Sequence, residues 1–229
     1  SEYNLAALKD TPPLLVLPSP RILRADAWAA LMSLVERGST LIVTGPIGED
    51  DHWILRDRFP EKGISYQTTP VAQEEMLVID GVEYRLNYRG EKIQRIEKAV
   101  SNDPNANSII RLQRGKGNIL WSLLPVELAE NPDATAALYK YGLKLAGLSP
   151  SFMATSDDPS LLIYPAAYKD AVLYTLVSET GRDVNIKLTP NSIHDTLEVN
   201  LKAQRAALLL LGKKDGQVLC SYNAGSRTL

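Results

Sequence analysis

The stretch LLVLPSPRILRADAWAALMSLVERGSTLIVTGPIG, residues 14–48, decides the fold of the first part of this chain. It opens with a short apolar run, Leu14–Leu17, and closes with a run rich in β-branched residues, Thr40–Thr44. Between these runs, apolar residues recur at the spacing of one helix face: Trp28, Leu31, Met32 and Val35. Gly38 follows them, where a helix often ends in a left-handed glycine. Strand, helix and strand in about 30 residues predict a βαβ unit with parallel strands.

A hairpin and further strands are predicted after this unit. Asp80-Gly81 separates two apolar segments, 76–79 and 82–86, and this dipeptide is a strong hairpin signal. Segment 92–96 is a candidate third strand. Two more strands, at 108–113 and 118–123, flank a turn that contains two glycines.

A second helix follows the last of these strands. Asn131 is expected to cap it, with Pro132 in the first helical position and Gly147 at its end. Segment 149–159 is rich in Ser, Pro and Asp and is expected to be a linker. We therefore predict an α/β domain with a parallel sheet over residues 1–150 of the 229-residue chain.

The remainder, residues 151–229, is expected to be an all-β domain. It shows no helical period, and turn signals such as Lys214-Asp215-Gly216 divide it into short segments. Six strands at regular spacing favour a small antiparallel sandwich; they are predicted at 161–164, 171–178, 184–188, 196–201, 205–211 and 217–222.

Composition excludes several classes of function. The formal net charge is −2 and the pI is near 5.8, so nucleic acid is not an expected partner. No apolar run approaches the roughly 20 residues of a membrane span, so a membrane partner is not expected either. Cys220 is the only cysteine, which rules out an internal disulfide. We expect a soluble protein, cytoplasmic or secreted in a bacterium, and a piece of a longer polypeptide.

Motifs for nucleophiles and phosphates are missing. No Ser or Cys lies in the G-x-[CS]-x-G context of a nucleophile on a strand-to-helix turn. Ser19 follows the first strand, but Pro18 and Pro20 beside it lack the N–H groups of an oxyanion hole. Gly45 and Gly48 match no phosphate-binding fingerprint, and three carboxylates follow them directly. We therefore predict no catalytic residue and no cofactor.

The loop after the second predicted strand is the candidate site. Glu49, Asp50, Asp51, His52 and Trp53 lie where the carboxyl ends of parallel strands often bind ligands. Consecutive acids rarely converge on one ion, so a solvated acidic loop is favoured over a metal site. Trp53 is a candidate contact for a sugar or for another subunit. The alternative is that its side chain packs under its own loop. Trp28 and Trp121 are predicted core residues.

Three segments together resemble a known family. Residues 14–51 resemble the start of the trimerisation domain of family 42 β-galactosidases, an amidotransferase-like (flavodoxin-like) α/β domain. Residues 115–150, GKGNILWSLLPVELAENPDATAALYKYGLKLAGLSP, are similar to the last strand and helix of that domain. Residues 161–188 look like the small C-terminal β-sandwich of the same enzymes.

The resemblance implies a pair of noncatalytic domains from a glycoside hydrolase. In that family the catalytic glutamates lie on a (β/α)₈ barrel of about 250 residues, which this chain does not contain. Its expected partners are then its own catalytic barrel or other subunits, including a homo-oligomer, and carbohydrate. Two alternatives stay open, a carbohydrate-binding module that uses the Trp53 loop and a small α/β enzyme of unknown reaction.

Overall fold

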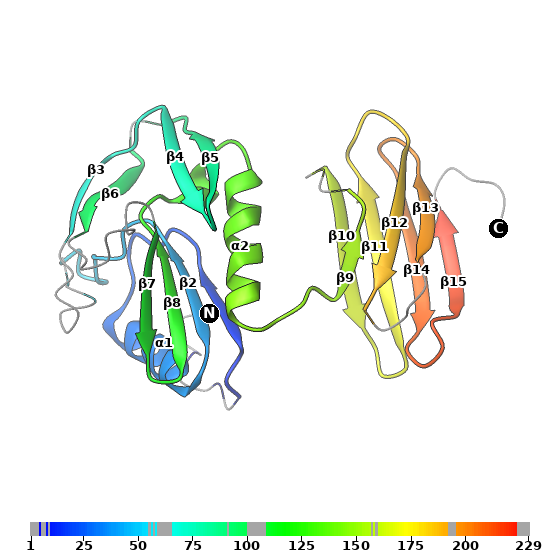
Figure 1. The fold of residues 1–229 in the computed structure, drawn as a ribbon, viewed down its shortest axis with the longest axis horizontal. Helices are drawn as coiled ribbons and strands as arrows, with labels where there is room; N and C mark the ends of the chain where they lie inside the picture. The colour runs from blue at the N-terminus through cyan, green and yellow to red at the C-terminus, as the bar shows by residue number, and fades with distance from the viewer. Residues whose placement is uncertain are drawn as a thin grey trace. The chain divides into compact units, whose positions relative to one another are not determined.

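The computed structural model describes residues 5, 8, 10–54, 56, 58, 66–90, 92–99, 109–156, 158, 160–191 and 196–223. The chain divides into two compact units, Ser1–Leu148 and Ser149–Leu229 (Figure 1). The first unit contains both α-helices of the described residues, and the second consists of strands and turns. Each unit has its own hydrophobic core.

The first unit is built on a four-stranded sheet with the order β1-β2-β8-β7. β1 (Leu14–Leu17), β2 (Thr40–Thr44) and β8 (Gly117–Ser122) are parallel, with Leu15 opposite Leu41 and Leu41 opposite Ile119. β7 (Ile109–Arg114) is antiparallel to β8, because a short turn joins the two strands. The sheet is therefore mixed, with three parallel strands and one antiparallel edge strand.

The predicted βαβ unit is present, and its helix ends at the predicted glycine. α1 (Ala25–Arg37) connects β1 to β2. Gly38 has φ of 128°, and the N–H groups of Gly38 and Ser39 donate to the carbonyls of Val35 and Leu34. These bonds satisfy carbonyls in the last turn of the helix, which have no partner within it.

The two helices pack on opposite faces of this sheet. Strand residues alternate, so Leu41, Val43 and Trp121 join one core with α1, while Ile42 and Leu120 join a second core with the other helix. That helix is α2 (Asp133–Leu145), seen beside the sheet in Figure 1. Gly142 permits its close approach, since a Cβ there would lie 2.2 Å from Cδ1 of Ile42.

The second core is covered by the predicted hairpin. β4 (Glu74–Ile79) pairs antiparallel with β5 (Val82–Asn87). Asp80 and Gly81 both have positive φ, as a two-residue type I′ turn requires. Leu77 of β4 and Leu86 of β5 are fully buried and form part of this core.

Two predictions for this unit need correction, and two of its elements were not predicted. The third strand, β6 (Gln94–Ala99), pairs with β3 (Tyr66–Pro70), which was not predicted, and not with the hairpin. Pro132 occupies the N-cap position of α2, so Asn131 does not cap it. The Asn131 amide instead accepts from the Asn87 N–H and donates to the Arg85 carbonyl, tying the hairpin to the helix. A short 3₁₀ helix, η3 (Val126–Leu128), precedes α2.

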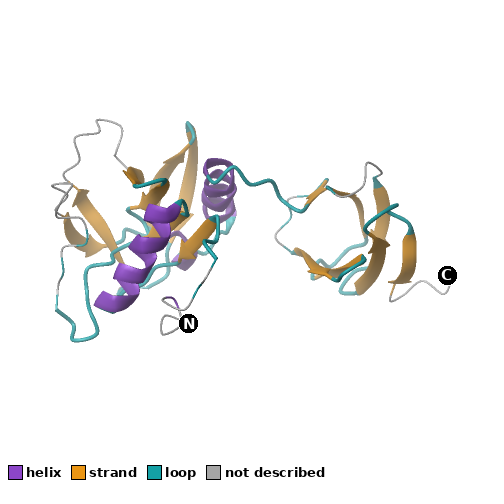
Figure 2. Cartoon of the chain, turned by 90° about the horizontal axis from the view of Figure 1, so that it is seen from below, coloured by secondary structure: helices purple, strands orange, loops and turns teal. Residues whose placement is uncertain are grey.

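The second unit is a sandwich of two antiparallel sheets, which Figure 2 shows nearly end-on. All six predicted strands are present. One sheet has the order β10-β11-β14-β15 and the other β13-β12-β9. The strands are β10 (Leu161–Ala167), β11 (Ala171–Ser178), β12 (Val184–Pro190), β13 (Leu197–Leu201), β14 (Ala206–Gly212) and β15 (Val218–Asn223). Residues such as Leu176, Leu188 and Leu209 fill the space between the sheets.

The predicted linker contains a strand. β9 (Phe152–Ala154) pairs with the end of β12, Phe152 opposite Pro190. The Phe152 ring meets the Tyr174 ring edge-to-face at 5.9 Å. Ser and Pro residues around this short strand obscured it in the sequence, because three residues are too few to show a period.

Candidate functional site

The loop predicted as a site lies beyond the carboxyl ends of β1 and β2. Ile22 and Glu49 form an isolated parallel bridge, and the Leu23 N–H donates to the Glu49 carbonyl. The segments that follow the two strands are thereby joined side by side. This placement agrees with the expectation from the parallel βαβ unit.

Asp50 is a structural residue within this loop. Its carboxylate is buried, accepts the backbone N–H groups of His52 and Ile54, and pairs with Arg56 at 2.7 Å. The hydrogen bond from Arg56 is the main cause that lowers the pKa of Asp50 to about 2. The expectation of a fully solvated acidic loop is therefore wrong at Asp50, because its carboxylate organises the turn.

Trp53 is one of the most exposed large apolar side chains among the described residues, at 63%. Its φ of 61° is unusual for a bulky residue and is held by the turn at Asp50, whose carbonyl accepts the Trp53 N–H. The Arg21 guanidinium lies 5.1 Å from the ring centroid and 3.4 Å from Glu49. Trp53 therefore does not pack under its own loop. It presents an aromatic surface next to one cation and one carboxylate.

The side chains of Asp50, Asp51 and His52 do not come together around one point where they could bind an ion. Asp51 and His52 are exposed, and Asp50 is committed to Arg56 and to backbone N–H groups. Within the described part of the chain, no three His, Cys, Asp or Glu side chains are grouped closely enough to hold a metal ion. His194, the other histidine, lies outside the described residues.

The buried Arg58 anchors the loop from below, and no sequence pattern indicated this role. It is 5% exposed and donates to the carbonyls of Leu23, Ile47 and Glu49. Its guanidinium also lies 5.8 Å from the Trp28 ring centroid. One carbonyl from the segment after β1 and two from the loop after β2 thus meet one buried cation, which fixes the positions of both carboxyl-edge loops.

A second polar cluster at the same edge was also missed. The hydroxyls of Ser19 and Thr44 both donate to Oε2 of Glu127, and Tyr139 donates to Oε1 at 2.8 Å. Ser19 has φ of 40°, and its N–H donates to the Thr44 hydroxyl. Burial and the Glu127 carboxylate raise the pKa of Tyr139 above its usual range. The cluster ties the segment after β1, the end of β2, η3 and α2 together through one carboxylate.

This cluster does not form a nucleophilic site. Ser19 meets a carboxylate and a hydroxyl, whereas a catalytic triad places an imidazole beside its serine. The Ser19 N–H is already used, and the prolines on either side have none to offer an oxyanion. The surroundings of Ser19 in the described residues therefore differ from those of a triad serine.

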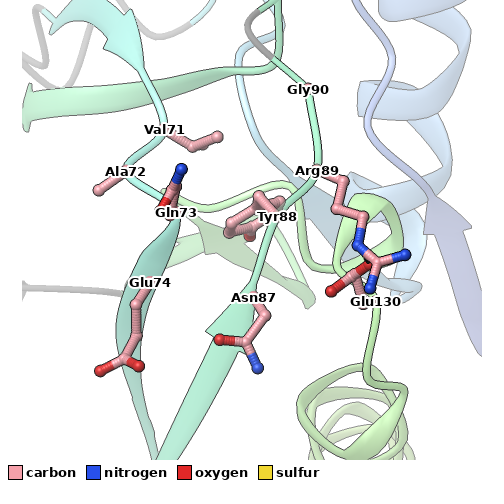
Figure 3. Close-up of a pocket in the computed structure, with 9 residues that line it drawn as sticks. All are labelled: Val71, Ala72, Gln73, Glu74, Asn87, Tyr88, Arg89, Gly90 and Glu130. Atoms are coloured by element: carbon pink, nitrogen blue, oxygen red, sulfur yellow. Dashed lines mark ion pairs between the residues drawn. The ribbon is translucent and has the colours of Figure 1, made fainter.

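A pocket of about 580 Å³ opens at the base of the hairpin (Figure 3). Its floor includes Val71 and the ring of Tyr88, whose pKa is raised by burial. Glu74 and Asn87, opposite each other on β4 and β5, lie on one side, and the Arg89–Glu130 ion pair lies on the other. Sequence patterns could not find this pocket, because its residues come from three separate segments.

The likeness of this chain to known proteins lies in its structure and not in its sequence. No protein-family model matches the chain, and no curated protein matches it in sequence. Solved structures do match. The structure of a catalytic mutant of Gan42B, a GH42 β-galactosidase from G. stearothermophilus, has a TM-score of 0.62 at 14% identity, over 92% of this chain and 35% of that chain.

Two more β-galactosidase structures are similar. The cold-adapted enzyme from Rahnella sp. R3 has a TM-score of 0.65 at 12% identity, over 87% of this chain and 32% of its own. The enzyme from Bacillus circulans sp. alkalophilus has a TM-score of 0.61 at 11% identity, with coverages of 86% and 32%. At these identities the likeness establishes the fold. The chain spans about a third of the length of the structures it resembles.

None of the helices in the described residues is long and apolar enough to cross a membrane.

Proposed function

We propose that this chain is a noncatalytic accessory region of a glycoside hydrolase, whose role is to hold the catalytic barrel and other subunits together. The fold likeness to one part of GH42 β-galactosidases is the observation that carries the proposal. In this proposal, Ser1–Leu148 corresponds to an amidotransferase-like, trimerisation-type domain. Ser149–Leu229 corresponds to a C-terminal sandwich domain.

The geometry at the carboxyl edge supports a noncatalytic role. Asp50 and Glu127, the carboxylates at this edge with the most hydrogen bonds, are both engaged in holding loops and helices in place. General acid–base chemistry needs a carboxyl that can exchange a proton with substrate. A carboxylate whose oxygens already accept from the protein's own donors is poorly suited to that task.

The proposal is tested by assaying the purified chain on nitrophenyl β-galactosides and related nitrophenyl glycosides. We expect release of nitrophenol at the rate of the buffer control. Glu127→Gln and Asp50→Asn serve as matched variants. Turnover above the control that one of these substitutions abolishes would contradict the proposal.

A carbohydrate contact at Trp53 is the second candidate function. The exposed ring favours it, because sugars stack on aromatic faces and hydrogen-bond to nearby carboxylates such as that of Glu49. Titration with galacto-oligosaccharides is expected to change the tryptophan fluorescence saturably, and Trp53→Ala is expected to remove the change. The buried Trp28 and Trp121 are expected to contribute a constant background to this fluorescence. A flat titration of the unaltered chain would exclude a sugar site at Trp53.

A further inference from the structure

The pocket at the base of the β4–β5 hairpin has a fixed shape (Figure 3). The Tyr88 N–H donates to the Gln73 carbonyl at 3.0 Å, which joins the two chain segments where they leave the hairpin. The Glu130 N–H donates to the Asn87 carbonyl at 2.8 Å and holds the segment before α2 against β5. The cavity of about 580 Å³ lies within the range of roughly 300–1,000 Å³ that is typical of small-molecule sites. A ligand therefore meets a preformed cavity.

The floor and the rim of this pocket differ in polarity. Val71 and the buried ring of Tyr88 form an apolar floor between the two segments. A ligand that fits both parts needs an apolar face for the floor and polar groups around its edge. The polar side chains of the rim are Gln73, Glu74, Asn87, Arg89 and Glu130.

Each carboxylate of the rim has a cation beside it. Glu130 forms an ion pair with Arg89, and Oε1 of Glu74 lies 3.4 Å from Nε of Arg85. The charges of these described residues therefore balance, and the rim favours neither a cationic nor an anionic ligand. Exposed pairs of this kind contribute little to stability, so their polar atoms stay accessible for bonds to a ligand.

The hydrogen-bonding capacity of the rim favours hydroxyl groups. Carboxylates only accept hydrogen bonds, and the Arg89 guanidinium only donates them. The exposed amides of Gln73 and Asn87 can do both. A hydroxyl also donates and accepts, so a ligand with several hydroxyls can bond to every kind of side chain at this rim.

We propose that this pocket binds a neutral saccharide, with a C–H face of the sugar ring on the floor and the hydroxyls at the rim. A neutral sugar ring combines an apolar face, several hydroxyls at its edge and no charge, and these are the properties that the floor and the rim select. The inference rests on the proposed function, since a glycoside hydrolase acts on saccharides. The lining residues lie in segments 71–74 and 87–90 and at Glu130, so this site is separate from the Trp53 loop.

The exposure of the rim sets the expected strength of binding. All five polar side chains of the rim are exposed, so a bound ligand would keep much of its surface in water. We expect a dissociation constant on the order of a few millimolar. A weak site of this kind can still hold a saccharide chain near a linked catalytic domain, because linkage raises the effective concentration.

The test is a titration of the full chain with D-galactose and with galactobiose, followed by proton–nitrogen correlation NMR. Concentrations up to about 50 mM exceed the expected dissociation constant. We expect saturable shifts of the backbone amide signals of residues 87–90. D-Galacturonate adds a carboxylate to the same ring and is expected to bind no more tightly than galactose, because the charges of the rim are already balanced.

Substitutions of the rim amides give the matched comparison. Asn87→Ala and Gln73→Ala each remove one amide and are expected to raise the dissociation constant at least about threefold. Asn200→Ala removes an exposed amide from a strand of the second unit and is expected to leave the constant unchanged. The dispersion of the same NMR spectra verifies that each variant is folded.

Four results would overturn the inference. They are the absence of saturable shifts, affinity that both rim substitutions leave intact, shifts confined to residues 49–53, and at least about tenfold tighter binding of galacturonate. The third would assign the sugar contact to the Trp53 loop, and the fourth would indicate an anion site at Arg89. None of them bears on the noncatalytic role, which fails only if the chain hydrolyses nitrophenyl glycosides.

Discussion

Asp50 shows how one side chain can organise a loop that looks like a simple run of acids. Its two oxygens accept two backbone N–H groups and the Arg56 guanidinium, so the charged form is favoured in the folded state. A carboxyl with a lowered pKa stabilises the fold above its ordinary pKa of 3.8. That contribution is lost as the pH falls towards about 2.

Asp50→Asn is therefore expected to destabilise the chain at neutral pH. The amide keeps an oxygen for the backbone N–H groups but loses the charge that Arg56 binds. Unfolding by urea, measured at several values between pH 7 and pH 2, should show the difference between the two proteins shrinking below about pH 4, where Asp50 becomes protonated in the unfolded state, and nearly vanishing near pH 2, where it is also protonated in the folded state. A difference that stays constant over this range would mean that Asp50 acts without its charge.

Tyr139 is expected to have the opposite pH dependence, because its contribution to stability is lost when the pH is raised. Burial and the hydrogen bond to Glu127 raise the pKa of Tyr139 above its ordinary value of 10.0. The folded state therefore holds this proton more tightly than the unfolded state. Its contribution to stability is present below about pH 10 and is lost as the pH rises further.

The near-ultraviolet tyrosinate titration checks this prediction. The difference between the unaltered chain and Tyr139→Phe isolates the residue, and its midpoint is expected to lie above that of a free tyrosine. Glu127→Gln should move the midpoint down, because the negative charge that opposes ionisation is removed. Equal midpoints with and without Glu127 would leave burial as the sole cause.

At the scale of elements, backbone contact sets the packing of the β7–β8 turn on α1. A Cβ at Gly117 would lie 2.1 Å from the Ser39 carbonyl oxygen and 2.2 Å from that of Val35. The Lys116 N–H donates to the Glu36 carbonyl, and Arg114 pairs with the Glu36 side chain at 2.9 Å. The turn can reach the end of α1 only because position 117 has no side chain.

Gly117→Ala is expected to destabilise the first unit by about 2 kcal/mol or more, because backbone atoms cannot yield as a flexible side chain can. Gly181→Ala is the control, since a Cβ there has no atom of the described residues within 4 Å. Its effect is expected to stay within about 0.5 kcal/mol. Denaturant unfolding of both variants measures the difference, and similar losses would show that the turn relaxes freely.

For the whole molecule, two separate cores predict two unfolding events. The units Ser1–Leu148 and Ser149–Leu229 have independent hydrophobic clusters, and chains of this kind depart from two-state behaviour. Calorimetry is expected to resolve two transitions. Gly117→Ala should lower one of them, and Leu188→Ala, which removes a fully buried side chain, should lower the other. One transition lowered by either substitution would indicate strong coupling between the units.

The sequence by itself determined the elements with local signals. The helix period around Trp28, the glycine at position 38, the Asp80-Gly81 turn and the six strands of the second unit all follow from contacts between near neighbours along the chain. Trp28 and Trp121 are in the core, as their patterns predicted. Such features need no knowledge of the rest of the fold.

Only the tertiary structure decided how distant segments combine. β9 in the supposed linker and the pairing of β3 with β6 depend on strands that lie elsewhere in the sequence. Arg58 and Glu127 became important because separate loops bring carbonyls and hydroxyls to them. Asp50 was expected in water and is buried, because its carboxylate turns inward to accept from Arg56 and from two backbone N–H groups of its own loop. Burial and polar pairing are properties of three-dimensional neighbours, which a local pattern does not encode.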